Sequence, residues 1–214
     1  MKQILAACLL VLAGNCAWAL DEAGNQRLAA IQQRWAEIQY QTPQKDKQAA
    51  FATLAAQTTA FTAQQPEAAE AWIWHGIVTS SWAGAQGGLG ALGKVKTAKA
   101  ALEKALELDP AALQGSAYTS LGTLYDQVPG WPIGFGDDDQ ADRLLRKALT
   151  INPHGIDSLY FWGDHLSRQG SYAEAREALL KAKQAAPRPG RELADQGRQA
   201  DIDALLQVIQ KKLD

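Results

Sequence analysis

The sequence is short of cysteine and histidine, has nearly balanced charge and lacks any long hydrophobic run. Its 21 Lys and Arg residues face 23 Asp and Glu residues, so the formal net charge is −2. A nucleic-acid-binding protein needs a concentrated basic face, which this balance does not supply. No segment approaches the roughly twenty apolar residues that a membrane helix requires. We therefore expect no nucleic-acid partner and no membrane span, although 47% hydrophobic residues are enough for one sizeable core.

The first nineteen residues have the features of an export signal. Met1-Lys2-Gln3 is a short positive start, and an apolar run of about ten residues extends from Ile4 to Ala13. Ala17-Trp18-Ala19 then provides the small-x-small pattern that a signal peptidase cleaves. We expect residues 1–19 to be a signal peptide cleaved after Ala19, and the mature protein to be located in the bacterial periplasm.

Both cysteines, Cys8 and Cys16, lie inside this predicted signal peptide. The mature chain then has no disulfide, no thiolate nucleophile and no cysteine metal site. Leu5-Ala6-Ala7-Cys8 also spells a lipoprotein box, which would make Cys8 a lipidated N-terminus. Only seven residues precede Cys8, and they leave almost no apolar stretch to engage the export machinery. Cleavage after Ala19 is therefore the favoured interpretation.

Three stretches of the mature chain share one ending. In each, an Ala is followed by Leu four residues later, by a second Ala after seven and by Pro after twelve. These offsets place the Ala and Leu residues on one face of a helix, which the proline ends. The three endings run from Ala98 to Pro110, from Ala141 to Pro153 and from Ala175 to Pro187.

A second helical segment with a central glycine precedes each ending. The small glycine lets two helices of a hairpin approach closely, while bulky neighbours fill the space around it. The pattern therefore predicts three helical hairpins. The segments are Trp72–Thr79 around Gly76, Tyr118–Tyr125 around Gly122 and Leu159–Leu166 around Gly163.

These repeats predict the organisation of the whole mature chain. No stretch shows the strict alternation of a surface strand. We expect an all-α solenoid of about four helical hairpins plus a C-terminal capping helix, with about nine helices in all. The predicted parts are a degenerate hairpin over residues 20–66, three repeats over 67–190 with insertions at 84–93 and 129–135, and the capping helix over 191–214.

Three patterns that could carry chemistry have simpler explanations. Gly88 to Gly93 spells G-x-G-x-x-G, but the preceding segment is helical, whereas a dinucleotide site needs a strand there. Asp137-Asp138-Asp139 lies at a helix start, where Asp is favoured as a cap. His75, His154 and His165 lack metal-ligand spacing. We expect no metal, no cofactor and no enzymatic activity.

Both insertions are apolar, and adjacent repeats should place them on the same edge of the solenoid. The second insertion is shaped by Pro and Gly around Trp131. An apolar loop of this kind either folds back over the groove or meets a partner. The two insertions either wall a hydrophobic pocket together or simply pack on the solenoid edge, and both alternatives stay open. The candidate pocket residues are Leu89, Leu92, Trp131, Ile133 and Phe135.

The pattern of an aromatic residue, Leu-Gly, Tyr, Ala, Leu and Pro resembles the tetratricopeptide repeat family over about residues 67–189. The resemblance implies a mostly non-enzymatic protein that binds proteins or peptides along a concave face. It also implies a groove lined by the first helix of each hairpin. The side chains there do not match the Lys and Asn clamp with which one subgroup holds a C-terminal carboxylate. By register, the groove positions are Ile73, Ile77, Thr119, Thr123, Tyr160, Asp164 and Arg168.

A narrower stretch resembles the exported helical T component associated with tripartite (TRAP) periplasmic transporters. It comprises Ala117 to Tyr125, then Pro129 and Gly136-Asp137 before a repeat helix. This resemblance implies tetratricopeptide hairpins with a hydrophobic-ligand channel, working with a periplasmic binding protein. Two functions are thus expected. The favoured one is a periplasmic scaffold or binding module for a protein or peptide; the alternative is a carrier of small hydrophobic ligands for a TRAP-type system.

Overall fold

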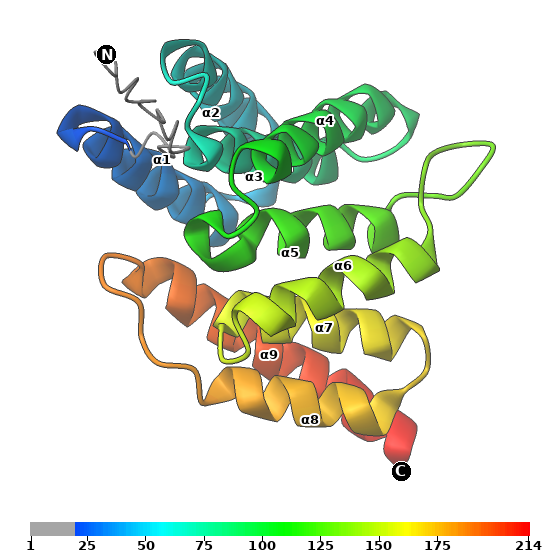
Figure 1. Cartoon of the computed structure of the whole chain (residues 1–214). Helices are drawn as coiled ribbons and strands as arrows, with labels where there is room; N and C mark the ends of the chain where they lie inside the picture. The colour runs from blue at the N-terminus through cyan, green and yellow to red at the C-terminus, as the bar shows by residue number, and fades with distance from the viewer. Residues whose placement is uncertain (1–19) are drawn as a thin grey trace, which may run out of the picture.

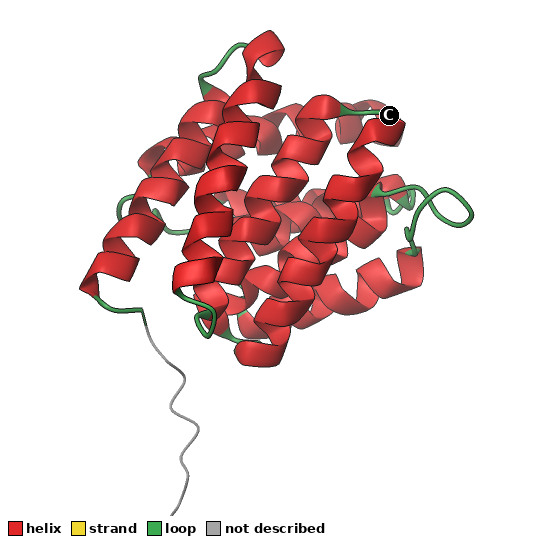
Figure 2. Ribbon diagram, turned by 90° about the horizontal axis from the view of Figure 1, so that it is seen from above, coloured by secondary structure: helices red, strands yellow, loops and turns green. Residues whose placement is uncertain are grey.

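The computed structural model describes residues 20–214. This part of the chain forms helices joined by loops and contains no strand (Figure 2), which confirms the predicted all-α solenoid. The predictions of a signal peptide and of lipidation at Cys8 concern residues 1–19, which lie outside the described residues. The helices are α1 (Glu22–Tyr40), α2 (Gln44–Gln64), α3 (Ala69–Gln86), a 3-10 turn η1 (Leu89–Ala91), α4 (Leu92–Leu108), α5 (Ala112–Gln127), α6 (Asp138–Ile151), α7 (Ile156–Arg168), α8 (Tyr172–Lys183) and α9 (Glu192–Leu213).

Acidic caps fix the start of two helices. The Asp21 carboxylate accepts a hydrogen bond of 2.7 Å from the backbone N–H of Gly24 at the start of α1. The Asp137 carboxylate accepts one of 2.9 Å from Gln140 at the start of α6, where the next two aspartates lie in the first turn. Such caps satisfy backbone donors that have no partner within the helix. The capping interpretation of the triple-aspartate run is confirmed.

The central glycine of each repeat lies where the two helices of a hairpin come closest. A Cβ placed on any of the three would lie 2.6–2.8 Å from the Cγ atom of a buried leucine on the partner helix. Any side chain there would push the helices apart, as the sequence pattern predicts. The pairs are Gly76 with Leu102, Gly122 with Leu145 and Gly163 with Leu179.

Both predicted insertions form connections, although the first is shorter than the sequence suggested. Helix α3 continues to Gln86 and α4 starts at Leu92, so only residues 87–91 separate the two helices. Gly87 and Gly88 make this turn with positive φ angles of 66° and 61°, which glycine adopts without strain. The second insertion forms the long loop between α5 and α6, which projects from the right edge of the molecule in Figure 1.

The helices form an inner and an outer layer, and the inner layer closes on itself (Figure 1). Helices α1, α3, α5, α7 and α9 pack one against the next, and α9 packs in turn against α1. At this seam the Tyr40 hydroxyl donates to Asp201 over 3.2 Å. Gly197 of α9 lies so close to Tyr40 that a Cβ would be 2.4 Å from its ring. The capping helix therefore joins both ends of the solenoid.

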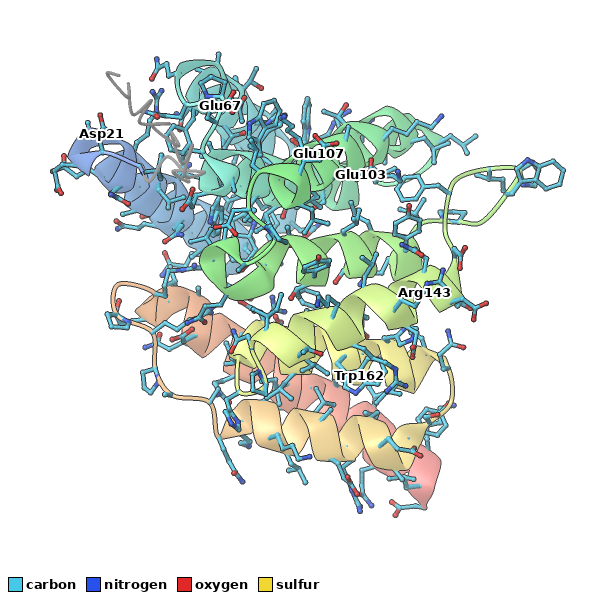
Figure 3. The ribbon with its side chains drawn as sticks, in the orientation of Figure 1. Asp21, Glu67, Glu103, Glu107, Arg143 and Trp162 are labelled. Carbon is cyan, nitrogen blue, oxygen red and sulfur yellow. The ribbon has the colours of Figure 1, made fainter. Side chains whose placement is uncertain are left out.

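The outer helices carry much of the charged surface. Figure 3 shows Glu103 and Glu107 on α4 and Arg143 on α6. Their inward faces instead present repeat residues such as Leu102 and Leu145, which are fully buried. No helix within residues 20–214 combines the length and apolar character needed to cross a membrane.

Candidate functional site: a cavity inside the helical ring

The ring of inner helices lines a cavity of about 1450 Å³ that is open to solvent on part of its surface. All five inner helices contribute to its wall, together with the start of α2 and the connections after α3, α5 and α8. Typical small-molecule sites occupy roughly 300–1,000 Å³. This cavity therefore has room for a sizeable small molecule.

The predicted groove residues separate into three groups. Ile73 has no exposed surface and belongs to the core, so its assignment to the groove was wrong. Helix α3 is packed by α1, α2, α4 and α5, and the face that reaches the cavity carries Trp74 and Ile77 instead of Ile73. Arg168 lies at the end of α7, is half exposed, and pairs with Asp126 and Asp164 at 3.3 Å. The groove residues that line the cavity are Ile77, Thr119, Thr123, Tyr160 and Asp164.

Residues of both insertions lie on the wall of this cavity, where Leu89 and Ile133 stay largely exposed. Leu89, Leu92 and Ile133 all line its wall. Trp131 instead points into solvent with 90% of its surface exposed. Phe135 packs edge-on against Tyr125, with ring centroids 5.3 Å apart, and is partly buried beside the core. The pair of insertions thus forms one apolar end of a larger cavity, without Trp131 or Phe135.

A cluster of charged side chains lies on another part of the wall, where no site was predicted from the sequence. Asp157 at the start of α7 accepts hydrogen bonds from Arg188 over 2.7 Å and from Arg198 over 2.8 Å. Arg188 also pairs with Asp195 at 2.6 Å, and Arg198 with Asp201 at 3.1 Å. These ion pairs attach α9 and the segment before it to the start of α7.

The cluster is electrostatically well compensated. Burial alone would raise the pKa of Asp157, but the guanidinium groups of Arg198 and Arg188 hold it well below its usual range. Burial would likewise lower the pKa of Arg198, yet the nearby carboxylate of Asp157 raises it above its ordinary value. Burial raises the pKa of Tyr40 beside this cluster, so its hydroxyl stays protonated and donates to Asp201. At neutral pH Asp157 and Arg198 therefore stay charged, and Tyr40 stays neutral.

The sequence did contain a signal for this cluster. Arg191, Asp195 and Arg198 precede Ile202 at spacings of four, three and four residues, so they extend the apolar stripe of the capping helix. Charged residues on the buried face of a helix need partners or a function. The sequence interpretation instead treated the segment from Pro187 to Gly190 only as a boundary between repeat and cap.

A left-handed turn at the start of α5 also shapes the wall. Leu113, Gln114 and Gly115 have φ angles of 46°, 56° and 75°, and the first two line the cavity. Positive φ in non-glycine residues is costly and persists where surrounding contacts enforce it. Here the amide of Asn152 donates to Gln114 over 3.0 Å and holds the turn.

The three histidines have separate environments. His75 contacts the Thr58 hydroxyl at 2.9 Å, and burial lowers its pKa. His165 is buried against Asp126 at 2.7 Å, and His154 lines the cavity. Among residues 20–214, no three His, Cys, Asp or Glu side chains gather as metal ligands would.

Comparison with protein families supports the tetratricopeptide resemblance. The family model described as tetratricopeptide repeat matches residues 89–111, which comprise η1, α4 and the turn that follows. A search of curated proteins finds no match to this chain. Tetratricopeptide repeats are helical hairpins, as are the repeats of this structure. They are typically non-enzymatic and are found in protein-interaction modules.

Proposed function

We propose that this protein is an exported, non-catalytic binding module that holds a small, partly apolar ligand in its central cavity. The closure of α9 onto α1 carries this proposal. An open solenoid offers a concave groove to an extended peptide, whereas here the five inner helices surround a cavity of about 1450 Å³. Ligand sites are clefts or cavities that bury most of a small ligand, and this partly open cavity is large enough to do so.

The composition of the wall supports this ligand class. Trp74 and Ile77 of α3 and Leu124 of α5 give apolar surface, and hydroxyls such as those of Thr119 and Thr123 lie among them. The Thr123 hydroxyl donates back to the carbonyl of Thr119 over 2.9 Å, so part of the polar wall is satisfied internally. A few directed polar groups within apolar walls are typical of small-molecule sites.

The experiment fills the cavity by a substitution in its wall and leaves the outer surface of the protein unchanged. The neutral probe N-phenyl-1-naphthylamine, which fluoresces in apolar surroundings, should bind the mature protein saturably. Thr123→Trp places a bulky ring in the cavity and should reduce its affinity at least tenfold, whereas Trp131→Ala on the exposed loop should not. Circular dichroism checks that both variants fold. Absence of saturable binding, or equal affinity in all three proteins, contradicts the proposal.

A second candidate function, binding of a protein partner, is favoured by the loop between α5 and α6. Trp131 is 90% exposed and Ile133 54% exposed on this projecting segment. Exposed aromatic residues on a Pro- and Gly-rich loop are common anchors in protein interfaces. Trp131→Ala should then weaken capture of a specific partner in cross-linking experiments while Thr123→Trp leaves it unchanged.

The proposed setting is the bacterial periplasm, with a TRAP-type transporter system as the candidate recipient of the ligand. The sequence pattern of residues 1–19 supports export. Cell fractionation followed by N-terminal sequencing should recover the protein from the periplasm, starting at Leu20. A cytoplasmic protein that retains Met1, or a membrane-anchored one starting at Cys8, would contradict this.

A further inference from the structure

One arginine of the cavity wall differs from its neighbours. Arg191, immediately before α9, lines the cavity with its guanidinium 5.1 Å from the ring centroid of Trp74. Its Nε atom is buried without a hydrogen-bond partner among the described residues. It also takes no part in the ion pairs that residues 20–214 form around it.

The two neighbouring arginines are fully engaged by comparison. Arg188 contacts the carboxylates of Asp157 and Asp195, and Arg198 those of Asp157 and Asp201. A guanidinium carries five N–H donors in a rigid fork and stays charged in proteins. Among the arginines of this wall that the structure describes, Arg191 is thus the one that pairs with no carboxylate of the protein.

The electrostatics of the three arginines differ in the same way. Carboxylates raise the pKa of Arg188 and Arg198 above the ordinary value, even though burial opposes this. For Arg191, burial and the positive charge of Arg188 lower the pKa, and the carboxylates of Asp157 and Asp195 do not offset them. An additional anion beside Arg191 would stabilise its charge.

The other end of the cavity is apolar. Leu89 and Leu92 of the first insertion and Ile133 of the second line it. Figure 1 shows the segment before α9 at the left edge of the molecule and the loop between α5 and α6 at the right edge. The charged cluster with Arg191 and the apolar residues of the insertions therefore lie toward opposite ends of the helices.

We infer that the ligand of this cavity is an amphipathic organic acid, whose carboxylate binds Arg191 and whose apolar body extends toward Leu89, Leu92 and Ile133. The inference rests on the proposed ligand-binding function of the cavity. Arginine and carboxylate match in a planar, bidentate geometry. Stacking on Trp74 holds the guanidinium by one face and leaves its N–H edge for the ligand.

The test compares an acid with its neutral counterpart. Decanoate and decanamide have the same chain but differ in charge, and both can be titrated into the mature protein by calorimetry at pH 7.5. We expect decanoate to bind at least tenfold more tightly. Arg191→Gln should reduce decanoate affinity at least tenfold and leave decanamide affinity unchanged, whereas Arg191→Lys should retain part of the preference.

A matched control separates the role of Arg191 from the general effect of removing one positive charge. Arg176 lies exposed on α8, so Arg176→Gln removes the same charge far from the cavity and should change neither affinity. Equal binding of the two probes to the wild type, or an undiminished decanoate preference in Arg191→Gln, overturns the anion site and leaves the cavity as an apolar one. Failure of both probes, together with N-phenyl-1-naphthylamine, overturns the proposed ligand-binding function itself.

Discussion

The seam between α1 and α9 can be tested with a single methyl group. Gly197→Ala adds a Cβ that would lie 2.4 Å from Cγ and Cδ1 of Tyr40 and 2.5 Å from Cδ2. Carbon atoms in favourable contact are about 3.5–4.0 Å apart. The two helices must therefore separate by about 1 Å, because Cγ cannot move away without displacing the whole ring.

The magnitude follows from two opposing effects. Overpacking of this kind costs about 1–3 kcal/mol, while replacing glycine by alanine inside a helix stabilises by up to about 1 kcal/mol. With a clash against three ring atoms we expect the upper end of the overpacking cost, about 3 kcal/mol, and hence a net loss of about 2 kcal/mol. For a chain of 150–250 residues this lowers Tm by roughly 4–8 °C.

Gly84→Ala is the matched control. Gly84 lies in α3, and a Cβ there would meet nothing within 4 Å. The same substitution should stabilise by up to about 1 kcal/mol and raise Tm by about 2–4 °C. Thermal unfolding followed by circular dichroism measures both. A Gly197→Ala protein as stable as Gly84→Ala would refute the close α1–α9 seam, and with it the closed ring.

Three further predictions concern the cavity cluster, the loop and the repeats. Asp157→Asn should cost about 2 kcal/mol, below the range for a fully buried pair because the side chain is about one third exposed to the cavity. Since folding lowers the pKa of Asp157 from its usual 3.8, the unfolded chain binds a proton first as pH falls below about 4. The free energy of unfolding of the wild type therefore falls below about pH 4. Urea titrations at several pH values should show a smaller fall for Asp157→Asn, which lacks this carboxylate. Trp131→Ala should change stability by at most about 0.5 kcal/mol in denaturant unfolding, because the ring is 90% exposed; a loss of about 3–5 kcal/mol would mean that the ring is core. Gly122→Ala should destabilise by about 1 kcal/mol through its 2.8 Å approach to Leu145, and its cost should be less than additive with Leu145→Ala in a double-mutant cycle.

The repeat hairpins were predictable from the sequence because their signals are local. The glycine and leucine of each pair lie in one repeat, and the fixed spacing of Ala, Leu and Pro marks the second helix. The range predicted for the first insertion, residues 84–93, was too wide. Gly84 and Gly93 have open space around them and normal helical conformation, so the helices continue through them.

The ring closure depends on contacts that no local pattern encodes. The Tyr40–Asp201 hydrogen bond joins residues 161 positions apart. A periodicity argument assigns α9 to the last hairpin, where it does pack, but gives no information about α1. The charged cluster likewise depends on a tertiary contact, because Asp157 meets Arg198 only where α9 packs along α7.

The candidate site was therefore only partly predicted. Register placed Ile77 and Thr123 on the cavity wall, since both lie in the first helix of a hairpin. It failed for Ile73, because neighbouring helices cover that face. Arg191 was missed, since its importance comes from the lack of a partner among the described residues, a property that only the three-dimensional arrangement shows.

Native mass spectrometry of the mature protein, purified gently from its own host, tests the central claim most directly. The account predicts an added mass of one small organic acid that is present under native conditions and lost on denaturation. It also predicts that the added mass is depleted in Thr123→Trp and Arg191→Gln but not in Arg176→Gln. A wild-type protein that carries no added mass, or the same added mass in all four proteins, would contradict it.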